Sequence, residues 1–104
     1  MTWKPKPKPT KLMAYNDPGH GWLRVPMAML HWLGIADKIS AYSYQSRPPV
    51  GMKLSKWAYL EEHCDMPKFL MAAKEKGIEL TISDQYTNNC SGIRSLPNFN
   101  QEGV

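Results

Sequence analysis

The sequence lacks long apolar runs, has only two cysteines, and contains no glycine-rich nucleotide motif of the dinucleotide or Walker A type. A membrane helix needs about 20 apolar residues, and no stretch approaches that length. The basic N-terminus continues into prolines, unlike a secretory signal, so we expect a cytoplasmic protein. Two cysteines, Cys64 and Cys90, in a small cytosolic domain are usually reduced, so no disulfide is expected.

Positive charge is concentrated at one end of the chain. The 104 residues include 13 Lys and Arg against nine Asp and Glu, a formal net charge of +4. Four lysines lie within residues 1–11, which leaves nine basic and nine acidic side chains in the remainder. A basic balance often indicates a nucleic-acid ligand, and here that indication applies to the arm. Its alternating Lys-Pro pattern favours an extended polyproline II form, which is also typical of a mobile tail.

The length fits one domain, which we place at residues 12–97, between a basic arm at 1–11 and a polar tail at 98–104. Alternation of apolar and polar residues predicts strands, and 3–4 spacing with suitable end residues predicts helices. The expected strands are 10–15, 22–25, 39–44, 56–62 and 78–83, and the expected helices are 27–33 and 66–76. This ββαββαβ order predicts an α+β fold, a mainly antiparallel sheet with two helices packed on one face. Asp65 is expected to be the N-cap of the second helix.

Aromatic side chains alternate along the hairpin expected at residues 39–62. Tyr42 and Tyr44 share one face of their strand, and Trp57 and Tyr59 share one face of theirs. If both pairs lie on the same sheet face, they form an aromatic platform beside a basic hairpin tip. That tip and its base contain Arg47, Lys53 and Lys56. Such a mixture can stack bases and contact phosphates, although the same rings could instead form the core beneath the helices.

Two polar segments carry the side chains best suited to chemistry. His20 lies between two glycines, where an imidazole can meet a ligand or simply hydrogen-bond its own loop. Glu61, Glu62 and His63 precede the second helix and could perform acid–base chemistry or hold a metal. However, neighbouring strand residues point to opposite faces, and the adjacent His63–Cys64 pair lacks the usual zinc-ligand spacing. We therefore predict no metal site, no cofactor and no catalytic residue.

Two loops complete the set of candidate features. Residues 16–19 predict a turn in which Asp17 hydrogen-bonds its own backbone. Residues 91–94 form a possible anion clamp, with backbone donors beside the Arg94 guanidinium. The alternative for the second loop is a surface segment that ends in a salt-bridged arginine. No nucleophile-elbow pattern accompanies these loops.

Four short motifs together resemble a group of small proteins of tailed bacteriophages and prophages. The motifs are Asp17–Leu23 (DPGHGWL), Ile39–Tyr44 (ISxYSY), Tyr59–Asp65 (YLEExCD) and Ser91–Arg94 (SxIR). The similarity spans roughly residues 15–94 and excludes the Lys-Pro arm. His63 stands where the pattern usually has an acidic residue, and the hairpin tip is longer than usual. Because the group has no agreed activity, the resemblance implies an infected-cell setting and no mechanism.

We expect a small phage-type accessory protein that binds without catalysis and acts in host takeover or against host defences. Its anticipated ligand is nucleic acid or a nucleotide-like signal. The expected ligand contacts are His20, Arg24, Tyr44, Arg47 and Arg94, and the expected partner contacts are Trp57, Tyr59, Lys53 and Lys56. Two alternatives stay open. One is an inhibitor that binds a host enzyme through the hairpin tip and exposed aromatic side chains, and the other is a small hydrolase or nuclease that uses His20 with Glu61 or Glu62.

Overall fold

Five strands form one mixed sheet in the order β3-β4-β2-β1-β5. The structure is a computed structural model, and it describes residues 10–52, 54–89 and 91–99. The strands are β1 (Thr10–Asn16), β2 (Gly21–Pro26), β3 (Tyr44–Gln45), β4 (Trp57–Glu61) and β5 (Leu80–Tyr86). The helices are α1 (Met27–Trp32) and α2 (Met66–Glu75), with short 3₁₀ turns at Ala36–Lys38 and Gly92–Ser95. The predicted α+β class is confirmed.

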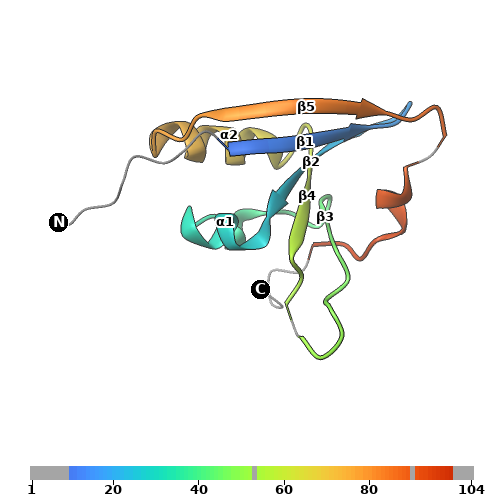
Figure 1. Ribbon diagram of the computed structural model, residues 1–104, viewed down its shortest axis with the longest axis horizontal. Coiled ribbons are helices and arrows are strands. Elements are labelled where there is room, and N and C mark those ends of the chain that lie inside the picture. Colours follow the sequence, from blue (N-terminus) through green and yellow to red (C-terminus); the bar gives the residue numbers. More distant parts are fainter. Residues whose placement is uncertain (1–9, 53, 90, 100–104) are drawn as a thin grey trace.

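The sheet is mainly antiparallel, as predicted. β1 pairs with β2, β2 with β4, and β3 with β4, all antiparallel. The exception is the edge formed by β5, which runs parallel to β1 with Thr10 opposite Leu80 and Asn16 opposite Tyr86. The sheet is strongly twisted. In Figure 1, β1 and β5 run across the view, whereas β4 runs nearly down it.

Both helices pack on the same face of the sheet. The residues in register on that face are Leu12, Ala14, Leu23, Val25, Ala58 and Leu60. They share one buried cluster with Leu30 of α1 and with Phe69 and Ala73 of α2. These three helix side chains are inaccessible to solvent. Period-2 burial in the strands therefore builds the core against the helices, as the sequence predicts. No helix within the described ranges is long and apolar enough to cross a membrane.

Asp65 occupies the N-cap position of α2, as the sequence predicts, but its side chain does not cap the helix. Its side chain makes no capping hydrogen bond, and its carboxylate accepts from the Ser40 backbone N–H at 3.0 Å and the Ser40 hydroxyl at 2.7 Å. It also accepts from the Ser43 hydroxyl and from Lys68 Nζ at 3.0 Å. A cap side chain normally accepts from the second or third helical amide, and Pro67, the second helical residue, has no N–H to donate. The fully buried carboxylate instead ties the 40–43 loop to α2.

The predicted strand at residues 39–44 is mostly a turn, so that prediction is wrong for most of its length. Only Tyr44–Gln45 pairs with β4, and Tyr42 is 72% exposed. The physical reason is the Asp65 network, because Ser40 and Ser43 bond to that carboxylate and pull the backbone out of an extended ladder.

The folded part continues past residue 97, where the tail was expected to begin. Phe99 is 4% exposed and lies in the core cluster, and its N–H donates to the Ser43 carbonyl at 2.8 Å. Asn98 forms an isolated bridge with Tyr44, and its side-chain amide donates to the Ala41 carbonyl. The Lys-Pro segment at residues 1–9 and the last residues, 100–104, lie outside the described residues.

Replacing the buried carboxylate tests its structural role. We expect Asp65→Asn to lower the free energy of unfolding by about 3 kcal/mol, because removing one partner of a buried charged network leaves Lys68 and the serine donors mispaired. Urea denaturation measures the change. The control is Asp37→Asn, an exposed acid in the Ala36–Lys38 turn, for which we expect a change within about 0.5 kcal/mol. Equal stabilities of the two variants would contradict this role.

Candidate functional site

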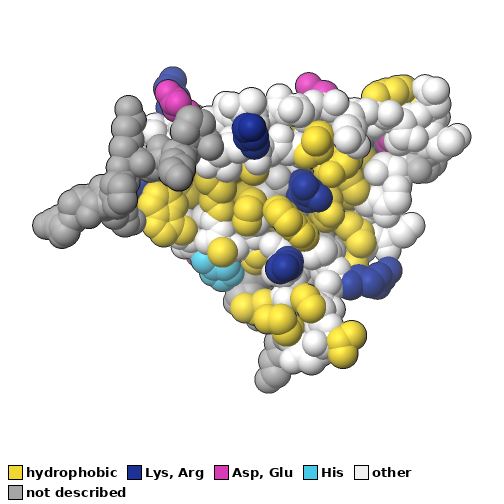
Figure 2. Space-filling view, viewed as in Figure 1, with side chains coloured by type: hydrophobic (Ala, Val, Ile, Leu, Met, Phe, Trp, Pro, Cys, Tyr) yellow, Lys and Arg dark blue, Asp and Glu magenta, His cyan; other side chains and the backbone are white. Residues whose placement is uncertain are grey.

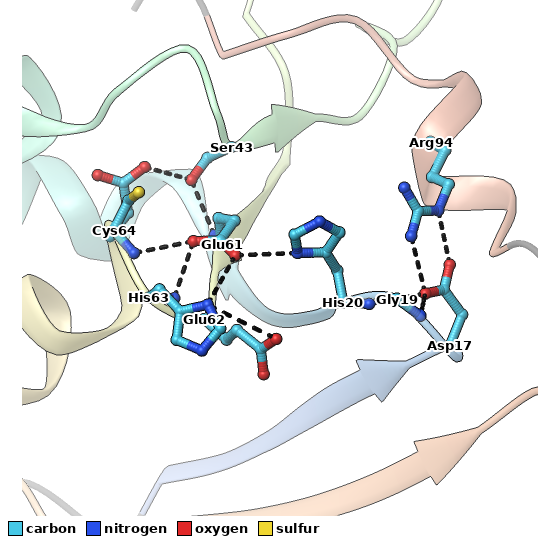
Figure 3. Close-up of polar contacts among 10 residues, drawn as sticks. Asp17, Gly19, His20, Ser43, Glu61, Glu62, His63, Cys64 and Arg94 are labelled. Carbon is cyan, nitrogen blue, oxygen red and sulfur yellow. Dashed lines mark hydrogen bonds and ion pairs between the residues drawn. The ribbon is translucent and has the colours of Figure 1, made fainter.

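A pocket of about 370 Å³ opens where the β1–β2 loop, the end of β4 and the C-terminal segment meet. Its lining is His20, Trp22, Ala41, Tyr42, Tyr44, Glu61, His63, Cys64, Arg94 and Asn98. Three of the predicted ligand residues, His20, Tyr44 and Arg94, therefore come together in one place. Figure 3 shows His20 with Glu61 on one side and the Arg94–Asp17 pair on the other.

Asp17 fixes the β1–β2 loop in the manner expected of a turn aspartate. Its Oδ1 accepts from the backbone N–H groups of Gly19 and His20, both at 2.9 Å. Arg94 donates to both oxygens, from Nε at 2.7 Å and from Nη2 at 2.9 Å. The Ser91 N–H adds a further bond at 2.9 Å. The Arg94 guanidinium, followed by the Ser91 amide, holds the pKa of Asp17 well below its usual range.

This pairing changes the interpretation of the 91–94 loop. The Ser91 amide and the Arg94 guanidinium, expected as an anion clamp, are engaged by Asp17 of the same chain. Gly19 permits the contact, since a Cβ there would lie 2.8 Å from Arg94 Nη2. The guanidinium carbon also lies 5.2 Å from the Trp22 ring centroid. Arg94 therefore forms a charge-compensated wall of the pocket, and the alternative of a salt-bridged arginine is the one observed.

Glu61 is a buried carboxylate at the end of β4, 7% exposed. Its Oε1 accepts from the backbone N–H groups of His63 and Cys64, both at 2.8 Å. Its Oε2 faces two imidazoles, with His20 Nδ1 at 3.3 Å and His63 Nδ1 at 3.6 Å. Burial acts to raise the pKa of Glu61, but the amide hydrogen bonds outweigh it and lower the pKa. The side chain is therefore ionised at neutral pH.

Glu61 and Glu62 do not point to opposite sides, contrary to the sequence expectation. β4 ends at Glu61, and the chain turns over residues 62–65, so strand alternation no longer applies to Glu62. One donor atom each from His20, Glu61 and Glu62 lie within 4.8 Å of one another. Gly21 leaves room for this, because a Cβ at that position would lie 3.0 Å from Glu62 Oε2.

Cys64 also lines the pocket, but its chemistry is that of a thiol. Desolvation, followed by its hydrogen bond to Glu61, raises the pKa of Cys64. A raised pKa keeps the sulfur protonated at neutral pH and makes it a poor nucleophile. Cys90, the other cysteine, lies outside the described residues.

The second candidate surface is the sheet face turned away from the helices, which we call the open face. It carries Met13, Tyr15, Arg24, Trp57 and Tyr59, which are in register and partly exposed. The Arg24 guanidinium carbon lies 4.4 Å from the Trp57 ring centroid and 5.7 Å from that of Tyr15. In Figure 2, hydrophobic side chains form a band with Lys or Arg side chains among them, across the region that β1, β2 and β4 occupy in Figure 1.

The aromatic side chains of β3 and β4 lie together on the open face and not beneath the helices. Tyr44 is directly opposite Tyr59, so these two rings lie on one face of the sheet, with Trp57 two residues along. Tyr59 is itself opposite Arg24, and the ring centroids of Tyr59 and Tyr15 are 6.3 Å apart. The rings therefore lie on the side away from the helices, and Tyr42 alone leaves the arrangement, in an exposed turn.

The remaining predicted residues belong to neither surface or have no described placement. Arg47 is exposed in the long connection between β3 and β4, where its Nη2 donates to the Ser95 carbonyl at 3.0 Å. Lys56 is exposed just before β4, and its carbonyl accepts from the Met27 N–H. Lys53 lies outside the described residues. Sequence reasoning missed Asp17 as the partner of Arg94, because the two are 77 residues apart.

Comparison with known proteins returned no match to a family model, a curated protein or a solved structure. The bacteriophage resemblance therefore stays a prediction from the sequence motifs. The function must be argued from the pocket and the open face themselves.

The Asp17–Arg94 pair predicts a specific acid sensitivity. Because the pKa of Asp17 is lowered by folding, its stabilising contribution is present above its unfolded pKa, near 4, and is lost as the pH falls below that value. We expect the free energy of unfolding to fall less between about pH 4 and 2.5 in Arg94→Gln than in the parent chain. Urea denaturation across that range measures it, with Arg47→Gln as the control that keeps the parent slope. Parallel curves for Arg94→Gln and the parent would contradict the assignment.

Proposed function

We propose that this chain binds single-stranded nucleic acid, or a nucleotide-like ligand of the same chemistry, on the open face of the sheet. One observation carries the proposal, namely that Arg24 lies over Trp57 at 4.4 Å and has no carboxylate partner among the described residues. Arg94, by contrast, is paired with Asp17. Of these two arginines, Arg24 is the one that keeps guanidinium donors for a phosphate.

The chemistry of the open face supports this ligand class. The solvent-facing side of an antiparallel sheet is usually polar, whereas this one presents the rings of Tyr15, Trp57 and Tyr59. Aromatic rings stack on any base, so such a platform binds single strands with little sequence preference. An arginine whose guanidinium lies over a tryptophan ring is preorganised for a charge-assisted hydrogen bond to phosphate.

The charges around the rings of the open face also favour an anionic ligand. Lys11 shares the face of Met13 and Tyr15 on β1 and is exposed. The neighbouring positions of β5 on this face are uncharged, namely Thr81, Ser83 and Gln85. Glu61 is the carboxylate on this side of β4, and it is buried at the pocket end. A basic, carboxylate-poor stripe favours an anionic strand, and the lysines of the 1–11 arm add positive charge to the same chain.

In the infected-cell setting that the sequence resemblance implies, such a protein acts as a small accessory factor on host or phage nucleic acid. Host takeover and the blocking of a host defence are both roles that a non-enzymatic binder can perform. The alternative of a host-enzyme inhibitor uses the same exposed rings, so the experiment must separate the two ligands.

Fluorescence anisotropy with labelled DNA and RNA single strands of about 12 nucleotides tests the proposal. We expect saturable binding at low salt that Tyr59→Ala and Arg24→Ala each weaken on the order of tenfold, through lost stacking and a lost phosphate contact. Arg24→Ala should also reduce the slope of log affinity against log salt by about 0.7, since one phosphate contact is removed.

The matched control is Lys74→Ala, which removes one charge from the exposed side of α2, on the helix layer. We expect it to bind within about twofold of the parent, because its charge is remote from the platform. Circular dichroism confirms that each variant is folded. Absence of binding to either strand at low salt, or equal losses in Lys74→Ala and Arg24→Ala, would refute the proposal. A nuclease-resistant complex with a host protein in place of oligonucleotide binding would favour the inhibitor.

The His20–Glu61 contact favours a second candidate, a small hydrolase or nuclease. Glu61 engages Nδ1 of His20, which leaves Nε2 as the imidazole nitrogen available to accept a proton from water in the pocket. If this is correct, a phosphodiester or ester substrate is cleaved at a rate that His20→Ala lowers on the order of 100-fold. His31→Ala, an exposed histidine on α1, is the control with parent activity. Equal rates for the parent and His20→Ala would eliminate this candidate.

A further inference from the structure

We propose that His20, Glu61 and Glu62 bind a divalent transition-metal ion at the wall of the pocket, with His63 as an adjacent donor. The proposal contradicts the sequence expectation of no metal site, and it depends on neither candidate function. It rests on the spacing of the donor atoms, on the hydrogen bonds that fix Glu61, and on the absence of a Lys or Arg partner for the carboxylates among the described residues.

The spacing suits a single ion. Two ligands bound tetrahedrally to zinc, each at about 2.1 Å, lie about 3.4 Å from each other. His20 Nδ1 is 3.3 Å from Glu61 Oε2, and one donor atom each from His20, Glu61 and Glu62 lie within 4.8 Å. His63 Nδ1 is 3.6 Å from Glu61 Oε2 and 3.9 Å from Glu62 Oε1. The His20 and His63 side chains are 47% and 78% exposed, so both imidazoles have room to turn toward the carboxylates.

Glu61 is held as a preorganised ligand. Two backbone N–H groups occupy Oε1, which leaves Oε2 directed at the imidazoles. The Glu61 backbone N–H donates to the Ser43 hydroxyl at 2.9 Å, and Ser43 donates in turn to Asp65. Supporting hydrogen bonds of this kind orient metal ligands in proteins and fix their geometry.

The two carboxylates, Glu61 and Glu62, also favour the binding of a cation. Glu61 is buried, and neither it nor Glu62 has a Lys or Arg partner in the described part of the chain. Buried carboxylates in proteins are normally paired with a cation or coordinate a metal. Here the nearest groups are imidazoles, whose neutral form is itself a metal ligand.

The donor set identifies the class of metal. Imidazole nitrogens combined with carboxylate oxygens suit Zn²⁺, Mn²⁺ or Fe²⁺, whereas Ca²⁺ and Mg²⁺ take oxygen ligands. Gly21 gives the Glu62 carboxylate room beside β2. Because His20, Glu61 and His63 line the pocket, the coordination positions not taken by protein face its open volume. A metal site with three protein ligands and an open position is the catalytic type, in contrast to closed structural sites.

Metal titration of the full chain, first stripped with a chelator, tests the inference. With Zn²⁺ in calorimetry we expect one ion per chain, and with Co²⁺ we expect the visible absorption of a low-coordinate site. His20→Ala and Glu62→Gln should each weaken Zn²⁺ binding at least about tenfold, since even supporting residues of metal sites have effects of that size. Both side chains extend from loops outside the core, so these variants keep the sheet intact.

Two controls make the result specific. His31→Ala removes an exposed imidazole from α1 and should bind Zn²⁺ like the parent. Cys64→Ser removes the thiol in the same pocket and should also keep binding, because the donors are imidazole and carboxylate. Absence of one-to-one binding, parent-like binding in His20→Ala, or binding lost only in Cys64→Ser would overturn the proposal. Oligonucleotide affinity of His20→Ala reports separately on the open face.

Discussion

The buried carboxylate of Asp65 is the contact on which the rest of the structure depends. It binds the backbone and hydroxyl of Ser40, the hydroxyl of Ser43 and the ammonium of Lys68, and it is inaccessible to solvent. Ser43 passes this constraint to the sheet by accepting the backbone N–H of Glu61. A helix, a loop and the end of β4 are thereby fixed together, and the orientation of the Glu61 carboxylate follows from that arrangement.

The elements that the sequence predicts well are those determined by neighbouring residues. The alternation expected over residues 56–62 gives β4, which is one residue shorter at each end, and Gly77, with φ of +74°, follows α2 as expected. The elements that it misses depend on distant partners. The 39–44 segment turns because Asp65, about 25 positions further on, binds its serines. The parallel pairing of β1 with β5 joins residues 70 apart, for which no local pattern exists.

The candidate functional residues divide along the same line. Residue types and turn chemistry were enough to select His20, Tyr44 and Arg94, which line one pocket. They could not separate an arginine held by a carboxylate from one that lies on a ring, because Asp17 and Trp57 are brought to Arg94 and Arg24 by the fold. Strand alternation also predicts the wrong direction for the Glu62 side chain, because β4 ends one residue earlier, at Glu61.

Two distinct surfaces lie on the side of the sheet that faces away from the helices. The pocket concentrates carboxylates and imidazoles, and the open face presents rings with an arginine that lacks a carboxylate partner in the described chain. The most direct test is an NMR titration of the labelled chain with a short single-stranded oligonucleotide at low salt. We predict that the amide signals of β1, β2 and β4 and the indole signal of Trp57 shift together and saturate. Shifts confined to α1 and α2, or no shifts, would contradict the central claim.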